Sequence, residues 1–199
     1  VMLEETLYPY RKLYVIFRTY NEGIAFRYEI PYQSGFEKVV IDKELTEFAF
    51  PKNTSVWESH GHEGKYYKVY PFEVKTDCEL PLTCQTPQGV YGAIMEAGNN
   101  HYPRAYLEAP YRKENILRIS LRGEAKGERG MVTAWRVISL ADEPGKLMEQ
   151  NYLLYNLNES CKLADTSWIK PGTVMRETTI STPECLKMID YCASMGISY

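Results

Sequence analysis

The segment Met95–Tyr102 is the best local candidate for chemistry in this chain. Val90–Met95 is apolar enough to form a buried strand, and Glu96 follows at its end, beside a polar loop that contains His101. A carboxylate in such a place can bind a hard cation such as Ca²⁺, which takes carboxylate and amide oxygens as ligands. The alternative is a glutamate that lies in solvent or pairs with an arginine such as Arg104, because charged residues lie mostly on the surface.

A change of pattern near residue 160 marks a second place for chemistry. Ser167–Lys170 is predicted to be a short strand, and it is followed by a loop, a helix and a new apolar run, Ile197–Tyr199. A strand, a helix and a strand in this order predict a βαβ unit, here the opening of a (β/α)8 barrel. Barrel enzymes work at the C-terminal ends of their strands, where Trp168 and Lys170 would lie.

The helix of this unit has signals at both of its ends. Thr182–Glu184 supplies an N-cap, a proline at the first helical position and an acid in the first turn. Apolar residues from Cys185 to Cys192 recur at helical spacing, and Gly196 stands where a left-handed C-cap is expected. The sequence stops as the second strand begins, whereas a barrel needs eight such units, so we expect the chain to be a fragment of a larger enzyme.

The first 160 residues have the pattern of antiparallel sheets. Leu13–Tyr20 and Ile24–Ile30 flank Asn21–Gly23, a turn signal whose glycine suits a left-handed backbone position. The second run alternates apolar and other residues, which indicates a strand with one buried and one solvated face. Further strands are expected at Val39–Ile41, Ala49–Phe50, Tyr66–Tyr70, Leu82–Thr83, Val90–Met95, Ile116–Leu121 and Met131–Leu140.

These patterns predict a mainly β protein with two domains. An antiparallel β-sandwich would occupy residues 1–160, and the first βαβ of a truncated (β/α)8 barrel would occupy residues 161–199. Leu147–Leu163, which mixes apolar residues with asparagines, is the expected connector.

Other residues suggest weaker hypotheses. His60–His62 could begin a zinc site, but the glycine between the two imidazoles suggests a solvated loop, and no further ligand is close in sequence. Aromatic residues could stack on sugars, although aromatic residues in strands are more often part of the core. These aromatic residues are Trp57, Tyr66, Tyr67 and Tyr70. The five cysteines form no CxxC pair and are expected to be mostly free thiols.

Composition and motifs argue against several classes of function. The net charge of -3 and the isoelectric point near 5.7 argue against a nucleic acid partner, which usually needs a basic patch. No run of about 18 apolar residues occurs, so no membrane span is predicted. Nothing shows that Glu177 and Glu184 meet as a carboxylate pair for glycoside hydrolysis. A nucleophile elbow, a P-loop and a dinucleotide fingerprint are also absent from the sequence.

Four ordered motifs resemble segments of glycoside hydrolase family 97. Phe17–Tyr28 looks like the RxYxxGxAFRY segment of that family's N-terminal super-sandwich domain, and Glu96–Leu107 is similar to its EA…YPxxxL segment. Ala134–Arg136 and Ser167–Gly172, the third and fourth motifs, resemble the segments that lead into its barrel. A further string, Arg176–Thr179, resembles one subgroup of the family. The resemblance covers nearly the whole chain.

This resemblance implies an α-glycosidase that acts on oligosaccharides, either α-glucosides or α-galactosides, in the periplasm or cell envelope of a bacterium. The parent enzyme would have a super-sandwich, a catalytic barrel on which the super-sandwich packs, and a C-terminal β-domain. Family members use calcium near the substrate, with a glutamate from the N-terminal domain, and the matching residue here is Glu96. His101, Trp168 and Lys170 are the candidate substrate contacts.

The family's catalytic carboxylates come from later barrel strands, so no catalytic residue is expected in this chain, and the chain alone is expected to be inactive. Two other interpretations remain open. The chain could be a β-sandwich that binds carbohydrate through surface aromatic residues without cleaving it. It could also be a purely structural domain, with Glu96 as an ordinary surface acid.

Overall fold

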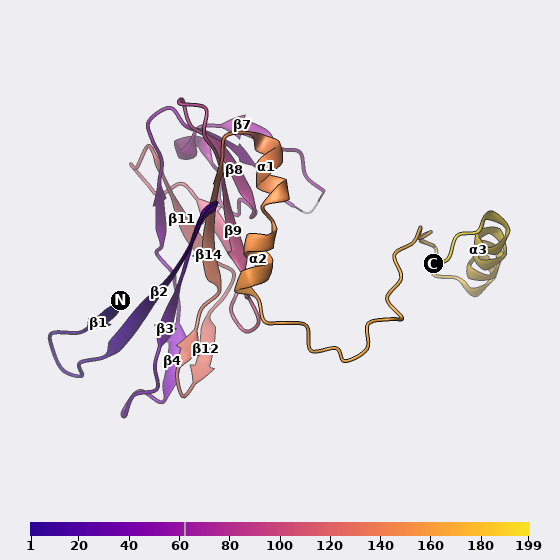
Figure 1. Ribbon diagram of the computed structural model, residues 1–199. Helices are drawn as coiled ribbons and strands as arrows, with labels where there is room; N and C mark the ends of the chain where they lie inside the picture. Colours follow the sequence, from indigo (N-terminus) through magenta and orange to yellow (C-terminus); the bar gives the residue numbers. More distant parts are fainter. Residues whose placement is uncertain (62) are drawn as a thin grey trace. The chain divides into compact units, whose positions relative to one another are not determined.

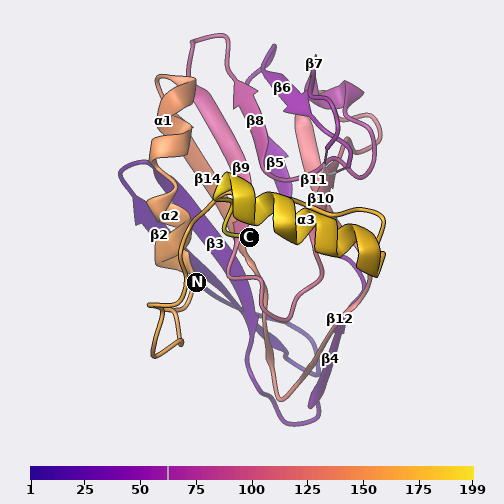
Figure 2. The ribbon, with the colours of Figure 1, turned by 90° about the vertical axis from the view of Figure 1, so that its right-hand side faces the viewer.

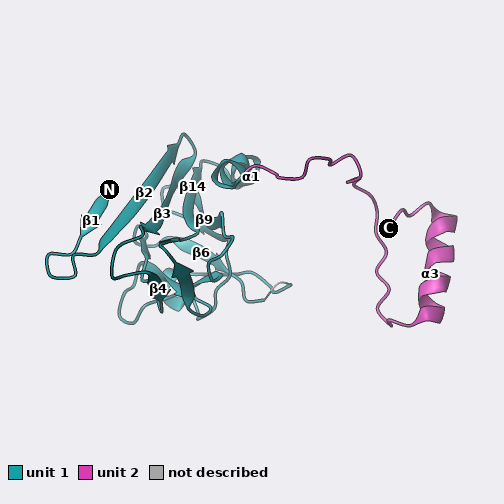
Figure 3. Cartoon of the chain, turned by 90° about the horizontal axis from the view of Figure 1, so that it is seen from below, with its two compact units in different colours: residues 1–159 teal, residues 160–199 magenta. Residues whose placement is uncertain are grey.

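The described residues, 1–61 and 63–199 of a computed structural model, fall into two units (Figure 3). The first unit, Val1–Glu159, contains every strand assigned within the described residues and two short α-helices. The second unit, Ser160–Tyr199, contains one α-helix. None of the described helices combines the length and the apolar character that a membrane span requires.

The hairpin predicted around Asn21–Gly23 is confirmed. Strands β2 (Lys12–Tyr20) and β3 (Gly23–Ile30) pair antiparallel, with Tyr20 opposite Gly23. Gly23 does not take the left-handed conformation expected for it. Instead, a Cβ atom at Gly23 would lie 2.1 Å from the carbonyl oxygen of Ile138 on the neighbouring strand. Glycine is therefore needed here for close backbone approach and not for the turn.

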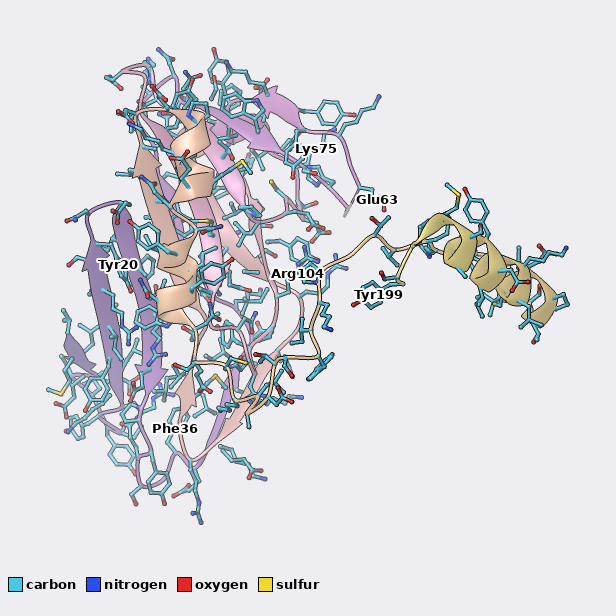
Figure 4. The ribbon with its side chains drawn as sticks, turned by 45° about the vertical axis from the view of Figure 1, so that its right-hand side comes forward. Tyr20, Phe36, Glu63, Lys75, Arg104 and Tyr199 are labelled. Carbon is cyan, nitrogen blue, oxygen red and sulfur yellow. The ribbon has the colours of Figure 1, made fainter. Side chains whose placement is uncertain are left out.

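The hairpin belongs to a nine-stranded antiparallel sheet with the order β1-β2-β3-β14-β9-β8-β6-β7, and β13 pairs with β3 beside this path. The other strands of this main sheet are β1 (Met2–Glu4), β6 (Ser55–Glu58), β7 (Tyr67–Val69), β8 (Leu82–Gln85), β9 (Tyr91–Ala97), β13 (Met131–Val132) and β14 (Trp135–Ala141). A short 3-10 helix, η1 (Pro71–Glu73), follows β7. In the stick view, Lys75 marks the end near β7, and Phe36 marks the opposite end of this unit (Figure 4).

Two smaller sheets complete the first unit. One contains β10 (Ala105–Glu108), β11 (Ile116–Leu121) and β5 (Glu47–Ala49), in that order. The other pairs β12 (Ala125–Glu128) with β4 (Lys38–Ile41). The three-stranded sheet packs on the main sheet through a shared apolar core, as expected for a β-sandwich. The most buried members of this core include Val56, Leu82, Leu107, Leu117 and Ile119.

The predicted connector, Leu147–Leu163, contains the end of one short helix and the whole of a second. Helices α1 (Pro144–Glu149) and α2 (Tyr152–Leu157) lie along the main sheet, near β9 and β14 (Figures 1 and 2). Leu153 and Leu157 are one helical turn apart and pack with Trp135 in a second core cluster. Helices of this length gain most of their stability from such packing, which a local pattern does not reveal.

Every predicted strand of the sandwich overlaps an observed strand, so the mainly β class is confirmed. The expected run Met131–Leu140 is divided into β13 and β14 at Thr133, whose hydroxyl accepts a hydrogen bond from the Tyr28 N–H group at 3.0 Å. Four observed strands were not predicted, namely β1, β6, β10 and β12. All five cysteines are free, and burial raises the pKa of the Cys78 and Cys84 thiols to about 11.

The helix predicted in the second unit is confirmed as α3 (Thr182–Met195). Its N-cap is Ser181, one residue earlier than expected, and the Ser181 hydroxyl accepts a hydrogen bond from the Glu184 N–H group at 3.4 Å. Gly196 ends the helix in the left-handed conformation, with φ of 66°.

The two strands predicted beside this helix are not formed, so the barrel opening is not confirmed. Ser167–Lys170 and Ile197–Tyr199 have no strand pairing, and the contact between the two regions is limited. The Met175 N–H group donates to the Tyr199 carbonyl at 2.8 Å, and the Tyr199 hydroxyl donates to the Lys170 carbonyl at 2.8 Å. Parallel strands are stable when neighbouring strands and helices cover them, and an isolated pair lacks this support.

Replacing Gly23 with Ala is expected to lower the free energy of unfolding by about 1–3 kcal/mol, because the new methyl group must displace the backbone of β14. Urea denaturation followed by circular dichroism measures this loss. Gly145→Ala is the matched control, since its Cβ would meet nothing within 4 Å and alanine favours a helix. An equal loss in both variants would contradict the explanation.

Candidate functional site

Glu96 and Arg136 face each other across the central pair of strands. The register of β9 and β14 places them directly opposite, and Arg136 Nη1 donates a hydrogen bond to Glu96 Oε2. The Arg136 side chain is fully buried, and 15% of the Glu96 side chain is exposed. The alternative prediction, that Glu96 pairs with an arginine, is therefore confirmed. The partner is Arg136, however, and Arg104 instead pairs with Glu79.

A second carboxylate holds the other side of Arg136. Its Nε donates to Glu44 Oε1 at 2.8 Å and its Nη2 donates to Glu44 Oε2 at 2.6 Å, which is a bidentate ion pair. Glu44 is itself buried. Burial alone would lower the pKa of Arg136, but the hydrogen bonds and charges of Glu44 and Glu96 outweigh it and raise that pKa. Arg136 therefore stays a cation between two carboxylates.

Glu44 has further donors on both of its oxygens. The Tyr102 hydroxyl donates to Oε2 at 3.1 Å, and the Thr46 hydroxyl donates to Oε1 at 2.8 Å. The Tyr28 hydroxyl lies 2.9 Å from the Thr46 hydroxyl. Burial, together with the charge of Glu44, raises the pKa of Tyr102, so its proton remains available for this hydrogen bond.

The loop after β9 positions the remaining oxygen of Glu96. Asn99 Nδ2 donates to Glu96 Oε1 at 2.7 Å, and Asn99 Oδ1 accepts from the Tyr102 N–H group at 3.2 Å. Gly98 adopts a left-handed conformation with φ of 61°, and its N–H group donates to Asn158 Oδ1 at 3.0 Å. One carboxylate oxygen and one amide thus lie at the exposed end of the buried network.

This donor set suits a hard cation but is incomplete by itself. Within residues 1–61 and 63–199, no group of three or more His, Cys, Asp or Glu side chains could hold a metal ion. Calcium takes six to eight oxygen ligands, so Glu96 could supply one carboxylate ligand and the others would have to come from elsewhere.

The predicted substrate contacts are spread over both units. His101 lies in the loop that follows Glu96. It lines a cavity of about 460 Å³ together with Arg27, Tyr102 and Lys126. Trp168 and Lys170 belong to the second unit, where both are exposed and Trp168 Nε1 donates to the Asp165 carbonyl at 3.1 Å. Their part in a shared site stays a prediction.

The other sequence candidates have different outcomes. His60 Nε2 lies 3.1 Å from Glu58 Oε2, and His60 Nδ1 lies 3.2 Å from the Asp77 carbonyl oxygen. His62 lies outside the described residues, so the zinc hypothesis is not tested. The expectation that the aromatic candidates belong to the core is wrong for Tyr66, Tyr67 and Tyr70, which are all exposed.

Sequence reasoning missed both Glu44 and Arg136 as site residues. Arg136 stands in an otherwise apolar stretch next to Trp135, and a charge inside a buried strand signals a buried partner. The identity of that partner could not be found this way, because Glu44 lies 92 residues away in the sequence.

Together, the fold and the site define an antiparallel β-sandwich domain that presents one carboxylate at the end of a central strand. The sequence model of the glycosyl-hydrolase 97 N-terminal domain matches residues 3–160. The chain therefore belongs to glycoside hydrolase family 97, and its main unit is the N-terminal domain of that family, which confirms the resemblance to that family.

Individual relatives agree with this assignment. The retaining alpha-galactosidase of Bacteroides thetaiotaomicron is 25% identical over 93% of this chain and 35% of that protein. A family 97 enzyme from Pseudoalteromonas sp. strain K8 in complex with acarbose has a TM-score of 0.81 and 26% identity, over 94% of this chain and 32% of that chain. The same values hold for a structure of that enzyme with panose. The chain thus spans about a third of the length of these relatives.

Replacing Arg136 with Met is expected to lower the free energy of unfolding by about 3–5 kcal/mol, because Glu44 would remain buried without a counter-charge. Urea denaturation measures the loss. Arg122→Met is the control, since the Arg122–Asp77 pair is exposed and such a pair contributes about 1 kcal/mol or less.

A double variant tests the stated cause. Combining Arg136→Met with Glu44→Leu removes both charges and should recover part of the lost stability. If the double variant is as unstable as the sum of the two single variants, an unpaired charge is not the reason for the loss.

Proposed function

We propose that this chain is the sandwich domain of an α-glycoside hydrolase that cleaves terminal α-glycosidic bonds. Family membership supports this, as does the α-galactosidase activity in the name of one relative and the acarbose and panose bound to another. Glycoside hydrolysis uses a pair of carboxylates on either side of the scissile bond. In this proposal those carboxylates lie outside the 199 residues, and the sandwich packs on the barrel that carries them.

The observation that carries the proposal is the position of Glu96. Its carboxylate lies at the end of β9, partly exposed, with one oxygen fixed by Arg136 and the other within reach of a small polar loop. Rigid support of this kind is what a ligand group needs if it is to reach from one domain into a site on another.

We further propose that Glu96 is one of several ligands of a calcium ion. Asn99 holds this carboxylate through its amide nitrogen, and the remaining ligands would come from outside this chain. When bound, the ion would supply positive charge near the substrate oxygens. The contributions of this chain are the orientation of the carboxylate by Arg136 and its separation from bulk solvent.

His101, Trp168 and Lys170 are retained as proposed contacts of the sugar. His101 is the best supported, because it lies in the same loop as Asn99 and lines the cavity beside it. A periplasmic or cell-envelope location is also a proposal and follows from the family resemblance alone.

A protein that extends this chain to the full length of its relatives is expected to hydrolyse 4-nitrophenyl α-glucoside or α-galactoside, and a calcium chelator should reduce the rate. The 199-residue chain alone should release no 4-nitrophenol from either substrate. Turnover is followed by absorbance. If the folded, calcium-loaded longer protein cleaves neither substrate, a non-catalytic carbohydrate-binding module becomes the better interpretation.

Glu96→Gln in the longer protein is expected to weaken calcium binding about tenfold or more, because a neutral amide replaces a charged ligand. Calorimetric titration with calcium provides a measurement that does not depend on turnover. Glu108→Gln is the matched control, since Glu108 also ends a strand and pairs with an arginine, Arg118, at 2.6 Å. Unchanged calcium affinity in Glu96→Gln would leave the purely structural interpretation of Glu96 standing.

A further inference from the structure

A second concave surface lies between three loops of the sandwich. Its volume is about 620 Å³, and its walls come from the turn before β6, the stretch from β7 into η1, and the β10–β11 loop. The pairing of the strands shows that this cavity lies far from Glu96. The turn before β6 precedes Ser55, which pairs with Gln85, and Gln85 pairs with Tyr91 at the start of β9. Glu96 lies five residues further along β9, or about 16 Å.

Aromatic rings form part of the lining of this cavity. The rings of Tyr70 and Phe72 are nearly parallel, at 10°, with centroids 5.8 Å apart, and both side chains are about half exposed. Tyr111 lines the cavity from the β10–β11 loop and is 83% exposed. Aromatic faces gathered in a hollow are typical of a binding surface, because solvated apolar area is otherwise unfavourable.

Uncharged hydrogen-bonding groups lie among these rings. Asn53 and Asn115 both line the cavity, and neither side-chain amide has a hydrogen-bond partner among the residues that the structure describes. The guanidinium of Arg112 lies 4.9 Å from the centroid of the Tyr111 ring. Each amide offers donors and acceptors of the kind that sugar hydroxyls require.

The backbone around the cavity is held in place by several interactions. Lys113 Nζ pairs with both Glu47 oxygens, at 2.7 and 2.8 Å, and the Asn115 carbonyl accepts from the Phe50 N–H group at 2.8 Å. On the other wall, the Tyr70 N–H group donates to Glu73 Oε2 at 2.8 Å. A ligand would therefore bind with little ordering of the protein, which reduces the entropic cost of binding.

We propose that this cavity binds an oligosaccharide without cleaving it, and the choice of α-linked sugars rests on the proposed function. A pyranose ring has apolar C–H faces that stack on aromatic rings and an edge of hydroxyls that bond to amides, and the lining provides both. The charged side chains of the lining are Lys52, Arg112, Lys113 and Glu114. Lys113 is paired with Glu47, and lysine and arginine side chains donate hydrogen bonds that sugar hydroxyls accept. The proposal goes beyond hydrolysis and calcium binding and uses none of the groups around Glu96.

Titration of the 199-residue chain with maltoheptaose, and separately with stachyose, tests the proposal by isothermal calorimetry in the presence of a calcium chelator. We expect the chain to bind at least one of these sugars. Tyr111→Ala and Phe72→Ala should each weaken binding about three- to tenfold, the contribution of one aromatic stacking contact. Unchanged circular dichroism would show that the variants fold.

Tyr66→Ala is the matched control, because Tyr66 is exposed but does not line the cavity, and it should bind as the unmodified chain does. Glu96→Gln should also bind normally, which separates this proposal from the calcium proposal. Failure of the folded chain to bind either sugar would overturn the inference, and so would an equal loss in Tyr66→Ala. Undiminished binding in both cavity variants would overturn it as well.

Discussion

The buried ion pair between Arg136 and Glu44 is the constraint on which the rest of the sandwich depends. A guanidinium buried on a central strand is unfavourable unless its donors find acceptors, and two carboxylates provide acceptors here. Glu44 comes from the segment before β5 and Glu96 from β9, so one side chain ties the main sheet to the layer opposite. Strand register is fixed by the same contact, since a one-residue slip would move Arg136 to the other face.

Hydrogen bonds connect this buried ion pair to the loop after β9 at the surface. Tyr102 donates to Glu44 through its side chain and to Asn99 through its backbone, so it links the loop after β9 directly to the buried ion pair. The partly exposed carboxylate of Glu96 thus ends a chain of hydrogen-bonded polar groups. Groups held in this way keep one orientation, because any other would leave a buried donor without an acceptor.

Local patterns in the sequence predicted the elements whose stability is local. The hairpin of β2 and β3 was found from its period of two, and α3 from its caps and apolar stripe. Glu96 was found because it follows an apolar run. Strand β12 pairs with β4, which lies far from it in the sequence, and the link from Glu44 to Arg136 joins residues 92 apart, so neither could be read from neighbouring residues.

Asn158 links the end of α2 to the loop beside Glu96. It ends α2, where the polypeptide leaves the sandwich, and its side chain accepts a hydrogen bond from Gly98, two residues after Glu96. The same side chain donates to the Leu154 carbonyl at 2.6 Å, and Arg18 holds the neighbouring Asn156 carbonyl at 3.2 Å. The end of α2 and the backbone of the loop beside Glu96 are therefore coupled, since a displacement of Asn158 would remove the hydrogen bond that its side chain accepts from Gly98.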